Sequence, residues 1–249
     1  MTMTNAAFEI IAPIGPSRWT VTCDHASNQV PASVSGGSLG LPPEDMQRHI
    51  AYDIGAAGVA RALSTALNGH AILSRFSRLV IDLNRGEDDP TLIMKVYDRT
   101  IIPANRALSQ AERNHRIESF YRPYHAALAN LAAEHETNPI VAVHSFTPQL
   151  SGRAKRPWHV GILTADQDRR LSDPLLDRLR AMPDLCVGEN EPYVGHLPGD
   201  SIDQHALANG RPNTLIEIRN DLIEHPDQQE VWAQRLATAL EGARRDAKL

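Results

Sequence analysis

The chain has 249 residues, of which 42% are hydrophobic and 22% are charged, as is ordinary for a soluble globular protein. Its length allows one large domain or two small ones with a sizeable core, and since no linker divides the sequence we predict a single domain over residues 1–249. The formal net charge of −5 gives no electrostatic basis for binding nucleic acid or anionic lipid, and no apolar run approaches the roughly 20 residues of a membrane span.

The first predicted strand ends in a cluster of polar and ionisable residues. Residues 19–23 alternate apolar side chains with threonines, which is the period of a half-buried strand, and Pro31 cannot continue a ladder. Between them lie Asp24, His25 and Asn28. Ligands of open α/β sheets bind beyond the carboxyl ends of the strands, so these three residues are candidates for a metal site or a catalytic base.

Predicted helices and strands alternate along the rest of the chain. A helix opens at Pro42 and runs to Leu67, where Asn68 and Gly69 end it. Because the strands are apolar runs, we predict a mixed sheet covered by helices on both faces, a three-layer α/β/α domain. Strands are expected at about 71–76, 79–83, 139–146, 159–163, 185–187 and 214–218, helices at 111–136, 168–181 and 227–245, and loops at 33–40, 90–108, 151–157 and 190–211.

Two histidines, His25 and His144, each close a predicted strand. Imidazole nitrogens are natural Zn²⁺ ligands, and a catalytic zinc site also needs a further ligand and an open position. An oxygen ligand could come from Asp24, Asn28 or Asp53, and a carboxylate binds zinc far better than an amide does. The alternative is a pair of hydrogen-bonded core histidines that hold no metal.

Arginines flank the strand predicted after the first long helix. Arg78 precedes it, and Asn84 and Arg85 follow it. Guanidinium groups bind carboxylates through two parallel hydrogen bonds, so arginines near a metal predict an acidic substrate. We expect Asp82 to orient one of these arginines. The alternative for Arg85 is a surface ion pair with a neighbouring carboxylate, which would stabilise the protein little.

Glu217 is embedded in an apolar strand. Burial of an unpaired carboxylate raises its pKa, and a carboxylate that titrates near neutral pH suits a general base. Arg219 and Asn220 follow it and add polar groups that could bind a substrate. The alternative is that Glu217 faces solvent on an edge strand.

Six segments, in this order, together resemble the N-formylglutamate amidohydrolase family. The resemblance covers residues from about 20 to 225. It implies a fold similar to zinc carboxypeptidases and aspartoacylases, of the phosphorylase/hydrolase-like type, and metal-dependent hydrolysis of an N-acyl amino acid. The segments are Cys-Asp-His-Ala-Ser-Asn-Gln-Val-Pro at 23–31, Tyr-Asp-Ile-Gly-Ala at 52–56, Ser-Arg-Leu-Val-Ile-Asp-Leu-Asn-Arg at 77–85, His-Ser-Phe-Thr-Pro at 144–148, Asn-Glu-Pro-Tyr at 190–193 and Ile-Glu-Ile-Arg-Asn-Asp at 216–221.

The resemblance also implies roles for single residues. Relatives carry a His-x-x-Glu pair, an Asn-Arg that holds the substrate carboxylate, a second histidine ligand and a late catalytic glutamate. The matching residues here are His25, Asn84 and Arg85, His144 and Glu217.

One position departs from the family pattern, because Asn28 stands where relatives have the metal-binding glutamate. Asp24 or Asp53 would then substitute for it, or the metal would bind more weakly, or another ion would be bound. The segments at 77–85 and 144–148 also indicate a divergent branch of the family, which leaves the acyl group open.

We therefore predict a cytoplasmic amidohydrolase of amino-acid metabolism that cleaves an N-acylated acidic amino acid, with N-formylglutamate as the reference substrate. The expected cofactor is Zn²⁺ or another divalent ion, and the expected partner is the small-molecule substrate, without nucleic acid or membrane. The alternative is a non-catalytic protein that binds an acidic metabolite and has lost the metal. The predicted metal ligands are His25, Asn28, Asp53 and His144, the substrate-binding residues Arg78, Asn84, Arg85, Arg219 and Asn220, and the catalytic residue Glu217.

Overall fold

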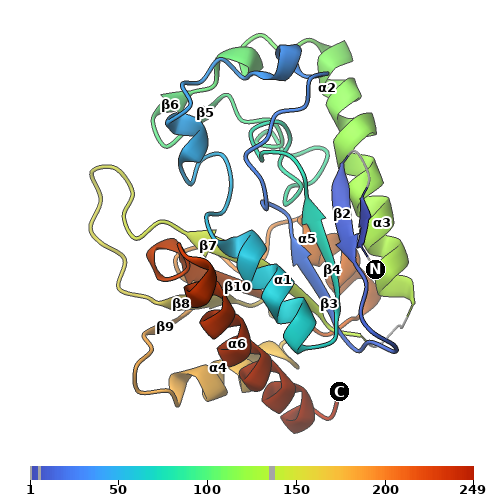
Figure 1. The fold of residues 1–249 in the computed structure, drawn as a ribbon, viewed down its shortest axis with the longest axis vertical. Coiled ribbons are helices and arrows are strands. Elements are labelled where there is room, and N and C mark those ends of the chain that lie inside the picture. The colour runs from blue at the N-terminus through green and yellow to red at the C-terminus, as the bar shows by residue number, and fades with distance from the viewer. Residues whose placement is uncertain (1, 5–6, 135–137) are drawn as a thin grey trace.

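An eight-stranded mixed sheet forms the centre of the computed structural model, which describes residues 2–4, 7–134 and 138–249 (Figure 1). The strand order is β1-β2-β4-β3-β7-β10-β8-β9. These strands are β1 (Thr2–Thr4), β2 (Phe8–Ile11), β3 (Thr20–Cys23), β4 (His70–Ser74), β7 (Ile140–Phe146), β8 (Val160–Leu163), β9 (Val187–Glu189) and β10 (Asn213–Arg219). A separate hairpin pairs β5 (Val96–Tyr97) with β6 (Thr100–Ile101).

The four central strands, β4, β3, β7 and β10, run parallel to one another. Every residue of β3, β7 and β10 is buried, as is usual for parallel strands whose two faces are both covered. The strand expected at 19–23 is therefore confirmed, but its expected half-burial is wrong. Since the carboxyl ends of parallel strands meet at one edge, residues that follow β3 lie near the ends of β7 and β10.

Helices cover both faces of this sheet, which confirms the predicted three-layer architecture. On one face α1, α4 and α6 share a hydrophobic core with strand residues such as Val21 and Ile216. On the other face α3 and α5 contribute Ala132 and Ile202 to a smaller cluster with Leu215, and Figure 1 shows α3 running along the side of the sheet opposite to α1 and α6. The helices are α1 (Ala56–Ala66), α2 (Gln110–Arg116), α3 (Arg122–Ala133), α4 (Ser172–Arg180), α5 (Ser201–His205) and α6 (Pro226–Asp246).

The chain before α1 differs from the long helix predicted from 42 to 67. Only a 3₁₀ turn at Asp45–Gln47 and α1 itself are helical, and the segment between them is irregular. Gly55 has φ +79°, and a Cβ at this position would lie 2.2 Å from the carbonyl oxygen of Ile223. The chain therefore turns sharply at Gly55. This turn leaves Asp53 in an irregular segment directly before α1.

Two further expectations differ from the structure. Residues 79–83, predicted as a strand, form turns, and the Val80 carbonyl accepts a hydrogen bond from the Arg116 guanidinium rather than from a neighbouring strand. The loop predicted at 190–211 contains α5, where Asp200 caps the helix by accepting a hydrogen bond from a backbone N–H of the first turn. Local sequence signals missed the turns at 79–83 because their hydrogen-bonding partner is distant in the sequence. They missed α5 because the helix is short.

The remaining predicted helices and strands are confirmed to within a few residues. The helix predicted at 111–136 corresponds to α2 and α3 joined by a π turn at Ile117–Tyr121, and its last residues, 135 and 136, lie outside the described part of the chain. Over the described residues, none of the helices combines the length and the apolar character that crossing a bilayer requires.

Gly55→Ala tests whether the turn before α1 depends on the missing side chain. The new methyl group would collide with the Ile223 carbonyl and would also sit at a positive φ. We expect a loss of about 1–2 kcal/mol in the free energy of unfolding from the backbone conformation and about 1–3 kcal/mol more from overpacking. Urea unfolding measures both.

Gly210→Ala is the matched control, because Gly210 has φ +62° and open space where its Cβ would be. It should lose only the backbone contribution. Equal losses in the two variants would contradict the proposed collision.

Candidate active site

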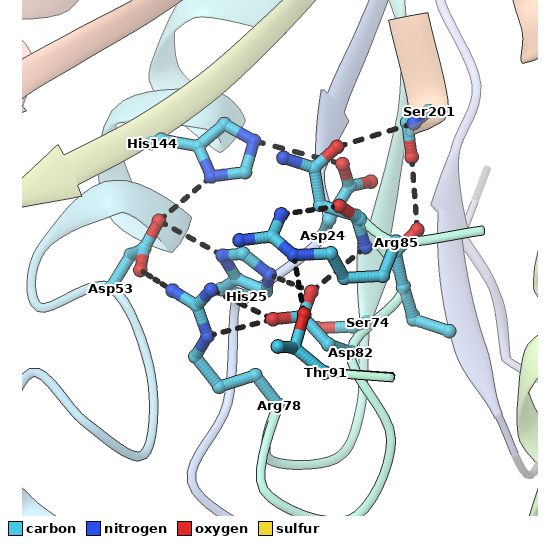
Figure 2. A network of polar contacts seen from close by, with 12 residues as sticks. Asp24, His25, Asp53, Ser74, Arg78, Asp82, Arg85, Thr91, His144 and Ser201 are labelled. Carbon is cyan, nitrogen blue, oxygen red and sulfur yellow. Dashed lines mark hydrogen bonds and ion pairs between the residues drawn. The ribbon is translucent and has the colours of Figure 1, made fainter. Parts of the chain in front are cut away.

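His25, Asp53 and His144 converge at the carboxyl edge of the sheet (Figure 2). His25 follows β3, His144 belongs to β7, and Asp53 reaches across from the turn before α1. Asp53 Oδ2 lies 2.9 Å from His144 Nδ1 and 3.3 Å from His25 Nδ1. All three side chains are buried, and one potential ligand atom from each lies within 4.8 Å of the others. Two imidazole nitrogens and a carboxylate oxygen could therefore hold one metal ion.

A further carboxylate lies next to the Nε2 atom of each histidine and is hydrogen-bonded to it only at His25. His25 Nε2 lies 2.7 Å from Asp82 Oδ1, and His144 Nε2 lies 3.6 Å from Asp24 Oδ2. The other oxygen of Asp24 accepts a hydrogen bond from the Tyr124 hydroxyl. A carboxylate beside Nε2 favours the proton on that nitrogen, so each Nδ1 could offer its lone pair to a bound cation in place of its present contact with Asp53 Oδ2.

Arg78 joins two of these carboxylates. Its guanidinium lies 2.7 Å from Asp82 Oδ2 and 3.5 Å from Asp53 Oδ1. Figure 2 draws both contacts as dashed lines. Burial opposes ionisation of Asp82, but Arg78 and His25 hold the pKa of that carboxyl well below its usual range. The prediction that Asp82 orients an arginine is in accord with this geometry, and the carboxylate orients His25 as well.

Glu217 lies beside this cluster on the neighbouring strand. It pairs with His144 in the parallel register of β10 and β7, so both side chains point to the same face of the sheet. Glu217 is 6% exposed, and its Oε2 has no hydrogen-bond partner. Burial raises its pKa to about 7. The alternative of a solvent-facing Glu217 on an edge strand is wrong, because β10 lies between β7 and β8.

A cavity of about 400 Å³ opens over the cluster and Glu217. Asn84 and Arg85 form part of its wall. The Arg85 guanidinium donates to the Asn84 carbonyl (2.7 Å) and to the Thr91 hydroxyl (3.2 Å). The nearby Glu87 instead pairs with Arg122.

Three of the predicted site residues lie away from this cavity. Asn28 donates through its side chain to the Met46 carbonyl, and Arg219 forms an ion pair with Asp221. Neither of them lines the cavity, and neither does Asn220. Asn28 matches a metal-binding position of the resembling family, yet Asp53 is the residue that contacts both histidines.

Several cavity residues were missed by the sequence reasoning. Tyr193 could have been identified from the sequence, because it is the last residue of the segment at 190–193 that carries the family resemblance. Burial raises the pKa of its hydroxyl. The resembling segments also contain Ser145, Phe146, Thr147 and Pro192. The remaining cavity residues carry no local signal, because they come from separate loops and strands and meet only in the fold. They are His49, Tyr97, Leu163, Val194, Gly195, Leu197, Asp200 and Leu215.

Comparison with known proteins finds a family and several similar structures. The model of the N-formylglutamate amidohydrolase family matches residues 17–224. The structure of gene product Atu2144 from Agrobacterium tumefaciens is 33% identical with a TM-score of 0.91, and the alignment covers 98% of this chain and 97% of that chain. An N-formylglutamate amidohydrolase from Ralstonia eutropha is 26% identical with a TM-score of 0.69, covering 98% of each chain.

A bacteriophage poly-gamma-glutamate hydrolase shares the fold, with a TM-score of 0.51, 9% identity, and coverage of 99% of this chain and 92% of that chain. No curated protein sequence matches this chain.

Glu217 should make the stability of the metal-free protein depend on pH. Its pKa of about 7 in the folded state lies above the ordinary value of 4.5, so the folded state binds the proton more tightly than the unfolded state does. The resulting stabilisation is fully present below about pH 4.5 and is lost as the pH rises through about 7. Relative to the wild type, Glu217→Gln should gain about 2–3 kcal/mol between pH 5 and pH 8.

Urea unfolding of both proteins in chelator across this range measures the difference. Glu44→Gln, at an exposed side chain, controls for the loss of one carboxylate. A pH-independent difference between wild type and Glu217→Gln would contradict the raised pKa.

Proposed function

The chain belongs to the N-formylglutamate amidohydrolase family of amide-bond hydrolases, and we propose that it cleaves the amide of an N-acyl amino acid with a bound divalent metal ion, Zn²⁺ in the first place. One observation carries the proposal. Two imidazole nitrogens and a carboxylate oxygen meet, all buried, beside the unpaired carboxylate oxygen of Glu217. N-formyl-L-glutamate is the reference substrate, because the family is named for it.

The chemistry of the site fits a divalent cation. A catalytic zinc takes three nitrogen or oxygen ligands and keeps an open position, and His25, Asp53 and His144 would supply those ligands. The buried carboxylates of Asp24, Asp53 and Asp82 face one buried arginine in this cluster, so a cation would offset excess negative charge. Burial opposes ionisation of His144, yet Asp24 and Asp53 hold its pKa well above the usual value, which reflects the same excess.

Glu217 is the proposed general base and acid. When bound, the metal would polarise the acyl carbonyl and lower the pKa of a water molecule. Oε2 of Glu217 takes a proton from the attacking water and then delivers it to the nitrogen of the leaving amine. A pKa of about 7 allows both transfers near neutral pH.

Arg85, with Asn84, is the proposed binding site for the substrate carboxylate. Both side chains line the cavity, and a guanidinium can bind a carboxylate through two parallel hydrogen bonds. Arg78 is proposed to position Asp53 and Asp82, since it already pairs with both. Arg219 is not carried into the proposal, because it lies outside the cavity.

We retain three further expectations as proposals, namely one domain over residues 1–249, a small molecule as the partner, and the cytoplasm as the compartment. The two cysteines, Cys23 and Cys186, are free, which is in keeping with a reducing environment.

Removal of a proposed ligand should remove the metal. Asp53→Ala and His144→Ala should each abolish stoichiometric zinc binding, measured by elemental analysis of protein purified without chelator. Asn28→Ala is the matched control and should keep one equivalent, because its side chain bonds to the Met46 carbonyl instead of the cluster. Full zinc content in Asp53→Ala would refute this ligand set. A metal-free wild type that still binds an N-acyl amino acid would favour the non-catalytic alternative.

Substitutions of the proposed carboxylate-binding residue and of the proposed base should change different kinetic constants. Arg85→Lys should mainly raise KM, because lysine keeps the charge and loses the planar fork. Glu217→Gln should lower kcat by about 10²–10⁴-fold with the metal still bound, because the side chain keeps its shape and loses the base. Hydrolysis of N-acyl amino acids, followed by amine release, measures both effects.

Arg219→Lys is the comparison variant and should leave KM unchanged. A KM that rises in Arg219→Lys and stays constant in Arg85→Lys would reverse the assignment of the carboxylate site.

A further inference from the structure

One side of the cavity is apolar, although the family name points to an acidic substrate. β8 and β10 are antiparallel neighbours, and Leu163 and Leu215 are partners in their register. Glu217 of β10 pairs with Gly161 of β8, and these two residues lie two positions from Leu215 and Leu163 on their own strands. The side chains of Glu217 and both leucines therefore share one face of the sheet. Both leucines line the cavity directly beside the proposed base.

The loop at 190–197 completes this side of the cavity. Gly195 packs so closely that a Cβ would lie 1.9 Å from the carbonyl oxygen of Thr164, and the Asn190 side chain accepts a hydrogen bond from the Thr164 N–H (2.8 Å). This anchoring holds Val194 and Leu197 at the cavity. We refer to Leu163, Val194, Leu197 and Leu215 together as the apolar wall.

The cavity provides an arginine for one substrate carboxylate. Of the two arginines that line it, Arg78 is already paired with Asp53 and Asp82. Arg85 bonds to a carbonyl and a hydroxyl, which are neutral, and no ion pair joins it to a carboxylate among the residues that the structure describes. A substrate with a single carboxylate would therefore match the one arginine that lines the cavity and has no carboxylate partner among the described residues.

A second carboxylate would meet unfavourable surroundings at the apolar wall. Asp200 lines the cavity there, and its side chain accepts hydrogen bonds from the N–H groups of Leu197 (3.1 Å) and Asp203 (2.8 Å). A glutamate side chain directed to this wall would lose its hydration next to leucines and would also face the Asp200 carboxylate. An aliphatic side chain would instead gain from burial against the same surface.

We propose that the amino acid released by this enzyme has an aliphatic side chain, with its one carboxylate on Arg85 and its side chain against the apolar wall. This inference rests on the proposed function and names the substrate class of that site. The cavity, at about 400 Å³, lies within the usual range for small-molecule sites.

A substrate panel tests the inference on the zinc-loaded wild type. The values of kcat/KM are compared for N-formyl-L-leucine, N-formyl-L-glutamate and N-formylglycine. We expect leucine to exceed glutamate by about 10- to 100-fold, the scale that a hydrophobic pocket achieves. Equal or faster hydrolysis of the glutamate compound would overturn the inference while leaving the proposed function intact. Absence of hydrolysis with all three would overturn the proposed function, and the inference with it.

A pair of variants then tests the apolar wall itself. Leu215→Asn keeps the approximate size of the side chain and should lower kcat/KM for the leucine substrate by about 10-fold, while N-formylglycine changes by less than about twofold. Leu207→Asn is the matched control, because Leu207 packs on the same hydrophobic cluster but does not line the cavity, and it should change neither value. Equal losses with both substrates in Leu215→Asn would show a structural effect and overturn the assignment.

Val194→Asn provides a second test that does not disturb the core, because Val194 is 63% exposed. It should reproduce the selective loss for the leucine substrate at a smaller amplitude. An unchanged ratio of the leucine to the glycine substrate in both Leu215→Asn and Val194→Asn would overturn the proposed wall.

Discussion

The carboxylate of Asp53 ties together three segments that are far apart in the sequence. One of its oxygens contacts both His25 and His144, and the other reaches Arg78. The backbone reinforces this arrangement, because the Asp53 N–H donates to the His25 carbonyl (3.0 Å) and the Ser145 N–H donates to the carboxylate (3.3 Å). This junction holds the two histidines and Arg78 in place above the parallel strands.

Buried charge explains why the cluster is connected so densely. An isolated ionised side chain in the interior is strongly unfavourable, so each buried charge needs partners. Asp82 contacts His25 and Arg78, and Asp24 contacts Tyr124 and His144. Glu217 differs from these aspartates, because no ion pair joins it to another of the described residues and its Oε2 has no hydrogen-bond partner. A buried carboxylate without an ion pair that lines the cavity is well placed to exchange a proton with a bound molecule.

The cavity divides into parts of different character. The proposed metal ligands and Glu217 form one part of its lining, and Arg85 with Asn84 forms another. The side next to β8 and β10 is apolar. The sheet places the apolar side next to Glu217, because residues that are two apart on a strand point to the same face. Glu217 and Leu215, two residues apart on β10, therefore both face the same bound molecule. The proposed substrate preference depends on both residues.

The sequence by itself determined the alternation of strands and helices and the central strands, because these depend on the period and length of apolar runs, which are local properties. It left Glu217 either buried or facing solvent, and the place of β10 between β7 and β8 decided for burial. It also pointed to His25 and His144, since both lie near the ends of strands that could be recognised. Only the tertiary structure decided which oxygen approaches the two histidines. Asp53 occupies that place instead of Asn28, because the helix starts only at Ala56, after the close approach of Gly55 to the distant Ile223, and Asp53 lies in the irregular segment before it. The pairing of Arg78 and the composition of the cavity were likewise decided by packing between remote segments, and no local pattern records such contacts.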